Sequence, residues 1–188
     1  MNNVENVSAG KPSITGAIWI APLGTTLPET TSESLNEAFK CLGYCSDDGL
    51  TNASNMESST VKAWGGDTVL VTNTSKEDQY KYTLIEATNV DVLKHVYGES
   101  NVSGDLDTGI ILKVNNHDLE EHSIVIDMIL RNNTAKRVVI PSGKVAEVGD
   151  VVYNDSDPIG YETTLVCLPD EDGFTHYEYI KKATEVSA

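Results

Sequence analysis

Basic side chains are scarce in this sequence. The 188 residues include 13 Lys and Arg against 29 Asp and Glu, which gives a formal net charge of -16. After Lys144, no Lys or Arg occurs until Lys181. Non-specific binding to nucleic acid or to anionic lipid needs a basic patch, so the composition argues against both activities. It is compatible with a protein that lies beside DNA without binding it.

Cysteine and long apolar runs are also scarce. Three cysteines, an odd number, indicate reduced thiols rather than a disulfide framework. Residues 1–13 contain neither the basic region nor the apolar region of a signal peptide. The apolar runs GAIWIAPLG and SIVIDMIL are too short to span a bilayer. We therefore expect an intracellular product of one folded domain that does not enter a membrane.

Motifs for catalysis or cofactor binding are missing. The sequence contains no nucleophile elbow, phosphate-binding loop or dinucleotide fingerprint. HDLEEH places His117 and His122 five residues apart, whereas zinc proteases use His-Glu-x-x-His on a helix. The acidic turns NDSDPIG and PDEDG do not follow the ligand order of an EF-hand, although a weak calcium site there stays open. The sequence predicts no enzyme, no cofactor and no metal site.

What the sequence does contain is mostly strand-like. In SIVIDMIL, alternate positions are apolar, which is typical of a strand with one buried face; these are Ile124, Ile126, Met128 and Leu130. Further strands are predicted at residues 14–23, at 68–74 and 79–86 joined by SKED, and in GIILKVN, KRVVIP, KVAEVGDVVY, YETTLVCLP and HYEYI. The predicted fold class is mainly β, a β-sandwich or barrel with one or two flanking α-helices.

Two segments have helical periodicity. TSESLNEAFKCLGY predicts a helix from the N-cap Ser32 to a stop at Gly43, with an apolar face that packs on the sandwich through Leu35, Phe39 and Leu42. NVDVLKHVYG predicts a second helix, capped by Asn89 and ended by Gly98.

The stretch between the helices, residues 46–63, has almost no periodicity and many turn residues. A loop of this length inside a compact domain is usually functional or interfacial. We therefore expect residues 46–63 to form an interaction loop.

The order of these segments resembles the major tail proteins of long-tailed bacteriophages, which build the tail tube. The resemblance extends from Gly16 to Ile180 and is carried by the colinear set GLT, KAWGGD, TLIE, VLKHVYG, VIP, EVGD and HYEYI. It implies a β-sandwich that forms hexameric rings, which stack so that inner strands join one β-barrel around the lumen. It also implies an N-terminal arm at 1–13, a tail tube domain at 14–180 and a C-terminal tail at 181–188. Both ends would order on assembly.

The resemblance also suggests which residues do what. The loop would reach a neighbouring ring, with candidate contacts at Asp47, Asp48, Asn52, Met56, Glu57 and Lys62. Acids at predicted hairpin tips would line the lumen and let the genome pass without sticking; the candidates are Glu77, Asp78, Asp118, Glu120 and Glu121. An outer-wall position, serving solubility, is the alternative for these acids.

The partners and location implied by the resemblance follow from a role in the tail. The partners are further copies of the chain, the tape measure, tail terminator and distal tail proteins, and double-stranded DNA in transit. The location is the virion tail, after synthesis in the host cytoplasm.

Two other classes of protein stay open at this stage. A β-sandwich binding module displayed on a virion, for example for carbohydrate, would need exposed aromatic side chains, and Trp19 and Trp64 are the two tryptophans. A metal hydrolase would use His117 and His122 but lacks the usual spacing. Rings or tubes in electron micrographs would favour the tail protein, whereas dependence on a saccharide or a metal would favour the others.

Overall fold

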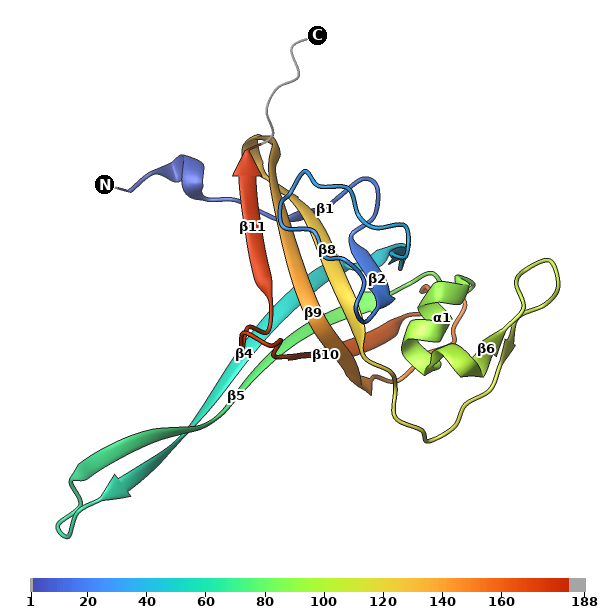
Figure 1. Cartoon of the computed structure of the whole chain (residues 1–188). Coiled ribbons are helices and arrows are strands. Elements are labelled where there is room, and N and C mark those ends of the chain that lie inside the picture. Colours follow the sequence, from blue (N-terminus) through green and yellow to red (C-terminus); the bar gives the residue numbers. More distant parts are fainter. Residues whose placement is uncertain (1, 183–188) are drawn as a thin grey trace.

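The structure is a computed structural model that describes residues 2–182 (Figure 1). It is mainly β, as predicted, and within the described residues it has one α-helix, α1 (Val90–Tyr97). Short 3₁₀ turns lie at Val4–Asn6, Glu99–Asn101 and Arg131–Asn133. The strands are β1 (Lys11–Pro12), β2 (Ile18–Pro22), β3 (Lys40–Cys41), β4 (Cys45–Lys62), β5 (Thr68–Leu84), β6 (Val102–Ser103), β7 (Ile111–Leu112), β8 (His122–Leu130), β9 (Thr134–Val148), β10 (Tyr161–Leu168) and β11 (Tyr177–Lys182).

Most of these strands belong to one antiparallel sheet with the order β3-β2-β8-β9-β10-β5-β4, with β1 added to β8 and β11 to β9. β9 serves two parts of this sheet, because its residues 134–139 pair with β11 and its residues 142–148 pair with β10. We call β3-β2-β8-β9-β11 the first leaf and β9-β10-β5-β4 the second leaf. The arrangement is consistent with a sandwich and is not a closed barrel.

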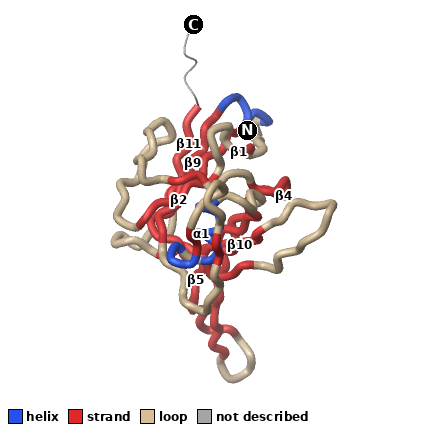
Figure 2. The backbone as a smooth tube through the Cα atoms, turned by 90° about the vertical axis from the view of Figure 1, so that its right-hand side faces the viewer, coloured by secondary structure: helices blue, strands red, loops and turns tan. Residues whose placement is uncertain are grey.

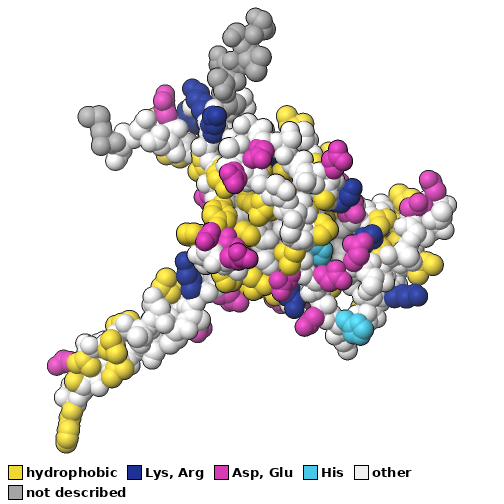
Figure 3. All heavy atoms as spheres, viewed as in Figure 1, with side chains coloured by type: hydrophobic (Ala, Val, Ile, Leu, Met, Phe, Trp, Pro, Cys, Tyr) yellow, Lys and Arg dark blue, Asp and Glu magenta, His cyan; other side chains and the backbone are white. Residues whose placement is uncertain are grey.

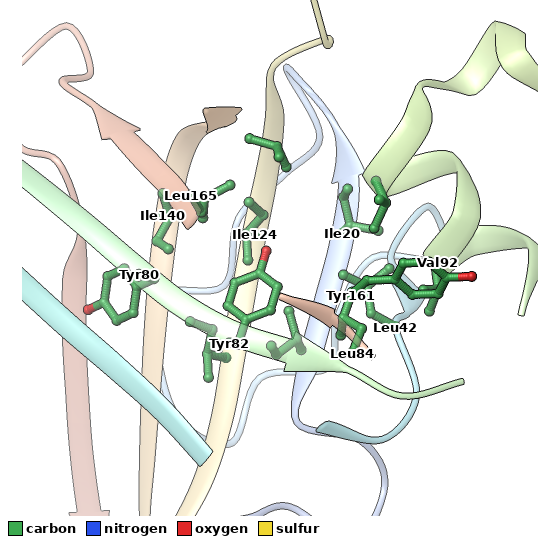
Figure 4. Packing of buried hydrophobic residues seen from close by; sticks show 14 of the residues in the cluster. Ile20, Leu42, Tyr80, Tyr82, Leu84, Val92, Ile124, Ile140, Tyr161 and Leu165 are labelled. Atoms are coloured by element: carbon green, nitrogen blue, oxygen red, sulfur yellow. The ribbon is translucent and has the colours of Figure 1, made fainter. Parts of the chain in front are cut away.

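The main core lies between the two leaves. Ile20 and Ile124 from the first leaf pack with Tyr82, Leu84 and Leu165 from the second (Figure 4). Helix α1 closes one side of this core through its own buried apolar residues, Val92, Leu93 and Val96. None of the described helices is long and apolar enough to cross a membrane.

Gly143 on β9 pairs with β8 of the first leaf and with β10 of the second. A Cβ atom at this position would lie 2.9 Å from the side chain of Ile124 and 3.1 Å from that of Leu165. A larger residue at this position, where β9 passes from one leaf to the other, would therefore require the ends of these two side chains to shift.

The alternation predicted for SIVIDMIL is confirmed. Ile124 and Ile126 belong to the main core and Met128 packs against it, while Leu130 is half-buried. Val125 points to the opposite face of the first leaf, where it is also buried, in a second cluster with Ala21, Phe39 and Val139. Both faces of the first leaf therefore contain buried residues.

The helix predicted at residues 32–42 is wrong. The segment is irregular except for β3, which pairs with β2 through Trp19↔Cys41 and Ile20↔Lys40. Phe39 is buried in the second cluster and Leu42 in the main core, on opposite faces of the first leaf, whereas residues on one helical face would point the same way. Leu35 packs only partly buried against the second cluster.

Arg137 explains why this segment is not helical. Its Nη1 donates hydrogen bonds to the carbonyl oxygens of Thr30, at 3.0 Å, and Glu33, at 2.7 Å. An α-helix starting at Ser32 would need the Glu33 carbonyl for a backbone N–H four residues later. Arg137 is itself buried and is held by Asp127, its cross-strand partner, at 2.7 and 2.9 Å. The guanidinium thus ties the irregular segment at residues 30–33 to β8 and β9.

The second predicted helix is present as α1. The side chain of Asn89 accepts a hydrogen bond from the backbone N–H of Asp91, at 3.0 Å, and Gly98 ends the helix with a positive φ of 102°. The sequence did not indicate that His95, on the same helix, is buried; its Nε2 lies 2.7 Å from the hydroxyl of Tyr82.

The 3₁₀ turn at Val4–Asn6 and the end of β11, close to the first and last described residues, lie at the same end of the body (Figure 1). Within the predicted N-terminal arm, β1 pairs with β8, and the backbone N–H of Arg131 donates to the Ser8 hydroxyl at 2.6 Å. At the other end, β11 continues to Lys182, two residues into the predicted C-terminal tail. Residues 183–188 lie outside the described residues. Ordering of both ends on assembly stays a prediction.

Candidate assembly interface

The most prominent feature of the surface is a long hairpin made by β4 and β5. It leaves the body as a narrow extension in both views of the backbone (Figures 1 and 2). The pairing runs from Cys45↔Leu84 at the body to Lys62↔Thr68 near the tip, with three register shifts. Residues 55–77, which we call the distal arm, are all exposed, whereas β5 becomes partly buried from Asp78 onwards.

The end of the distal arm is apolar on both faces. Val61 and Leu70 are direct cross-strand partners and so lie on one face, while Val69 and Val71, as neighbours of Leu70 on the strand, point to the other. All four are about half exposed or more, and apolar side chains visibly gather at the end of the arm (Figure 3). At the turn, Trp64 is completely exposed.

The predicted loop at residues 46–63 is wrong in structure. Most of these residues belong to β4, and all six candidate contacts lie on this strand. Asp47 and Asp48 fall in the register shift next to the body, Asn52 at the root of the arm, and Met56, Glu57 and Lys62 on the distal arm. The sequence did not indicate this strand because both faces of its distal part are exposed. Burial therefore imposes no alternation of apolar and polar residues on it. Whether these residues contact another ring stays a prediction.

The prediction of two strands joined at SKED is also wrong, because β5 runs unbroken through this segment. Glu77 is exposed on the distal arm, but Asp78 is 4% exposed. Its Oδ1 accepts from Asn52 Nδ2 at 2.8 Å, and its Oδ2 accepts from Thr175 Oγ1 at 2.7 Å and lies 2.5 Å from His176 Nδ1. Asp78 is therefore a buried structural carboxylate and not the exposed turn residue that was expected.

The Asp78 network fixes the root of the arm. Burial alone would raise the pKa of Asp78, but the hydrogen bonds from Thr175, Asn52 and His176 outweigh burial and hold the pKa below its usual value. The carboxylate thus stays ionised while it joins β4, β5 and the segment before β11. The arm leaves the body in a defined direction because three separate segments meet at this one side chain.

The remaining candidate acids lie in the segment HDLEEH, which connects β7 to β8 and is not a hairpin tip. Asp118, Glu120 and Glu121 are all exposed. Lys144 lies 3.5 Å from Asp118, and the Ser142 hydroxyl donates to Glu121 at 3.0 Å. Whether these acids face a lumen stays a prediction.

Within residues 2–182, no three His, Cys, Asp or Glu side chains are placed to hold a metal ion. His122 Nδ1 lies 3.1 Å from the carbonyl oxygen of Glu120, two residues away. Burial, followed by repulsion from Cys41, raises the pKa of Cys45 to about 11, so this thiol is protonated at neutral pH.

Sequence reasoning did not place Trp64 at the exposed tip of a hairpin. A signal was present, since Trp64 is followed by two glycines between two segments that form strands. In the structure Gly65 and Gly66 have φ values of 115° and 101°, which other residues rarely adopt. The turn is closed by hydrogen bonds from Ala63 N to Asp67 O and from Gly66 N to Ala63 O. A closed Gly-Gly turn places the preceding tryptophan at the outermost point of the hairpin.

The comparison with protein families agrees with the resemblance noted in the sequence. The family model described as "Phage tail tube protein" matches residues 1–188, the whole chain. No match was found among curated protein sequences. Among solved structures, the anti-feeding prophage cap, a tube terminating cap determined by cryo-EM, is similar at 8% identity, with a TM-score of 0.42 over 95% of this chain and 96% of that chain. On the evidence of the family model, this chain belongs to the phage tail tube protein family.

Proposed function

We propose that copies of this protein assemble into hexameric rings that stack into a tail tube, and that the tube is an acidic conduit for the genome. The hexamer follows the family resemblance. The observation that carries the proposal is the distal arm, which projects from the body with apolar side chains on both faces.

An unsupported hairpin of this kind calls for a partner. Two-stranded hairpins are at best marginally stable in water, and apolar patches on monomers usually mark interaction sites. Because Val61 and Leu70 lie on one face and Val69 and Val71 on the other, a single covering surface would leave half of them in water. The tip is therefore suited to insertion into a recess, in agreement with the expected contact to a neighbouring ring.

The free edge of the second leaf supports lateral assembly. β4 ends the strand order of the main sheet, so within the described chain its outer edge has no strand partner. Long unpaired edges act as templates for further strands. Pairing of this edge with the next copy around a ring would extend the second leaf into one barrel, which removes the edges altogether.

The charge of the chain suits passage of DNA. A net charge of -16 per copy repels the phosphate backbone, so DNA can move along the bore without binding to it. In this role the tube would surround a tape measure protein and meet tail terminator and distal tail proteins at its ends, as the family resemblance implies.

Electron microscopy of the purified protein tests this function. We expect rings or tubes at high protein concentration. The test variant lacks residues 57–75 and joins Met56 to Lys76 through an Asn-Gly turn. Met56 and Lys76 are cross-strand partners, so the shortened hairpin can close. This variant should keep the circular dichroism spectrum and thermal stability of the body but form no tubes. Wild-type protein that stays monomeric at all concentrations, with no tubes in the presence of other tail proteins, would contradict the proposal.

A further inference from the structure

The first leaf carries an open groove on the side away from the main core. The groove has a volume of about 660 Å³, which is enough for a large side chain and its neighbours. Its apolar lining consists of Leu27, Pro28, Val139, Pro141, Tyr177 and Tyr179. Its polar lining is acidic, with Glu29, Asp170, Glu171 and Asp172, and within the described residues it includes no Lys or Arg. The groove suits an aromatic anchor that is accompanied by a positive charge.

The tip of the arm offers an exposed aromatic side chain and a lysine, whose charge is balanced by Asp67 in the same turn. Trp64 stands completely exposed on its closed turn, and Lys62 ends the preceding strand two residues earlier. No atom lies within 4 Å of a Cβ built at Gly65 or Gly66. Glycine is therefore needed at these positions for the backbone conformation of the turn and not for close contacts within this chain. Exposed tryptophans of this kind are typical anchors of protein interfaces.

The distal arm carries much less net charge than the body, so it is the part of one copy that another acidic copy repels least. The distal arm holds Lys62 and Lys76 against Glu57, Asp67 and Glu77, a net charge of -1. Subtracting this from the whole-chain charge of -16 leaves -15 on the remainder. Two acidic bodies repel each other, whereas a nearly neutral arm with Lys62 beside its tryptophan meets little repulsion at an acidic groove.

We infer that the arm tip of one copy docks in this groove on a second copy, with Trp64 between the loops at residues 26–29 and 170–172 and Lys62 facing the acidic rim. The tip cannot reach the groove of its own chain, because the arm points away from the body and its residues 67–78 span on the order of 35 Å (Figure 1). The inference rests on the proposed self-assembly and specifies which surfaces meet.

This contact is heterologous, because the tip and the groove are different surfaces of the same chain. Every copy that donates a tip still has a free groove, so the contact repeats without closing on itself. Repetition along one direction is what the stacking of rings requires. The groove also lies beside the root of the arm, since residues 170–177 lead through Thr175 and His176 to Asp78.

Photo-crosslinking on assembled tubes tests the contact. A benzoyl-phenylalanine replaces Trp64, tubes are formed from mixed isotope-labelled and unlabelled protein, and crosslinked peptides are identified by mass spectrometry. We expect crosslinks between copies to residues 26–29 or 170–179. Crosslinks between copies to another surface, such as the exposed apolar residues Leu106, Ile111 and Val114, would overturn this inference while leaving self-assembly intact.

A charge exchange gives a second readout if the photo-crosslinking variant does not assemble. Lys62→Glu should raise the protein concentration needed for tube formation roughly three- to tenfold, and Glu171→Lys in the same chain should restore it. Lys76→Glu is the matched control, because it makes the same charge change on the arm away from the tip. The docking alone would be refuted if wild-type protein forms tubes but Lys62→Glu leaves the concentration needed for tube formation unchanged. It would also be refuted if Glu171→Lys does not restore that concentration. Absence of wild-type tubes would refute the proposed function.

Discussion

Strand β5 lies in two different environments. Its first ten residues, 68–77, are all exposed, while its last seven, 78–84, alternate between buried and less buried positions. The buried half packs Tyr80, Tyr82 and Leu84 into the main core, and the exposed half pairs only with β4. One continuous strand is thus part of a sandwich at one end and a bare ribbon at the other.

This difference separates what holds the fold from what serves assembly. In the body, burial of apolar side chains supplies the main stabilisation. On the distal arm, only backbone pairing and cross-strand contacts such as Val61 with Leu70 act within one copy, and each such pair contributes about 0.2–1 kcal/mol. The apolar residues of the arm are therefore free to contribute their burial energy when copies meet.

The largest expected effect compares one leucine from each region. Leu165 is completely buried between the leaves, so Leu165→Ala should lower the free energy of unfolding by about 2–5 kcal/mol. Leu70 is 52% exposed on the arm, so Leu70→Ala should change it by no more than about 0.5 kcal/mol. Urea melts of unassembled protein measure both values.

For tube formation, unlike for unfolding, Leu70→Ala should have the larger effect of the two variants. Leu70→Ala should raise the concentration at which tubes form, whereas folded Leu165→Ala protein should assemble with wild-type surfaces. If Leu70→Ala destabilised the single copy as much as Leu165→Ala, the arm would be packed in solution and the comparison between the two regions would fail.

Acid should have a smaller effect on the free energy of unfolding, and this effect should arise in the body and not in the distal arm. Burial, followed by repulsion from His122, lowers the pKa of His95 to about 3 from an ordinary value of 6.5. The unfolded chain therefore binds a proton at a higher pH than the folded chain does. The contribution of neutral His95 is complete above about pH 6.5 and is lost as the pH falls towards 3, by about 3 kcal/mol between pH 7 and pH 4.

Urea melts at these two pH values check the role of His95. His95→Gln keeps a hydrogen-bonding group for Tyr82 but does not titrate, so the loss of stability in acid should shrink by most of this amount. His117→Gln is the matched control, since His117 is exposed, and it should leave the loss unchanged. The distal arm contains no histidine. An equally steep loss of stability in His95→Gln would show that other groups cause it.

The sequence predicts the body well because its strands have one buried face. In β8 the alternation of Ile124, Ile126 and Met128 follows from the core on one side of the first leaf. Helix α1 was equally readable, because a side-chain cap at Asn89 and a glycine at 98 both act locally. Local signals and one-sided burial are what periodicity detects.

The sequence predicts poorly where distant contacts decide. Residues 32–42 have helical spacing, but the guanidinium of Arg137, about one hundred positions away, donates to the carbonyl oxygen of Glu33 in this segment and to that of Thr30 just before it. Asp78 looked like a turn residue beside Glu77, but it is buried because Thr175 and His176 reach it from the far end of the chain. Contacts over such separations leave no local pattern. The distal arm is a third case, since no part of the described chain buries it and its sequence therefore carries no period of two.

The smallest expected effect on the fold concerns the acids predicted to face the lumen. Glu120 and Glu121 are exposed on the segment before β8, so Glu120→Lys with Glu121→Lys should change the free energy of unfolding by less than about 1 kcal/mol. Their effect should appear in assembled tubes. If the two side chains face the bore, lysines there replace repulsion of the phosphate backbone by attraction in each copy of the ring.

Co-sedimentation of double-stranded DNA with assembled tubes measures this change. Lysine tubes should retain DNA at low salt and release it steeply as salt rises, because each phosphate contact displaces a condensed counterion. Glu120→Gln with Glu121→Gln is the matched control, since it removes the same negative charges without adding positive ones, and these tubes should retain far less DNA. DNA that digestion with nuclease cannot remove from the lysine tubes would lie inside the bore. Retention that nuclease abolishes would place the two acids on the outer wall, and lysine tubes that retain no more DNA than wild type would contradict the prediction that Glu120 and Glu121 keep the bore from binding DNA.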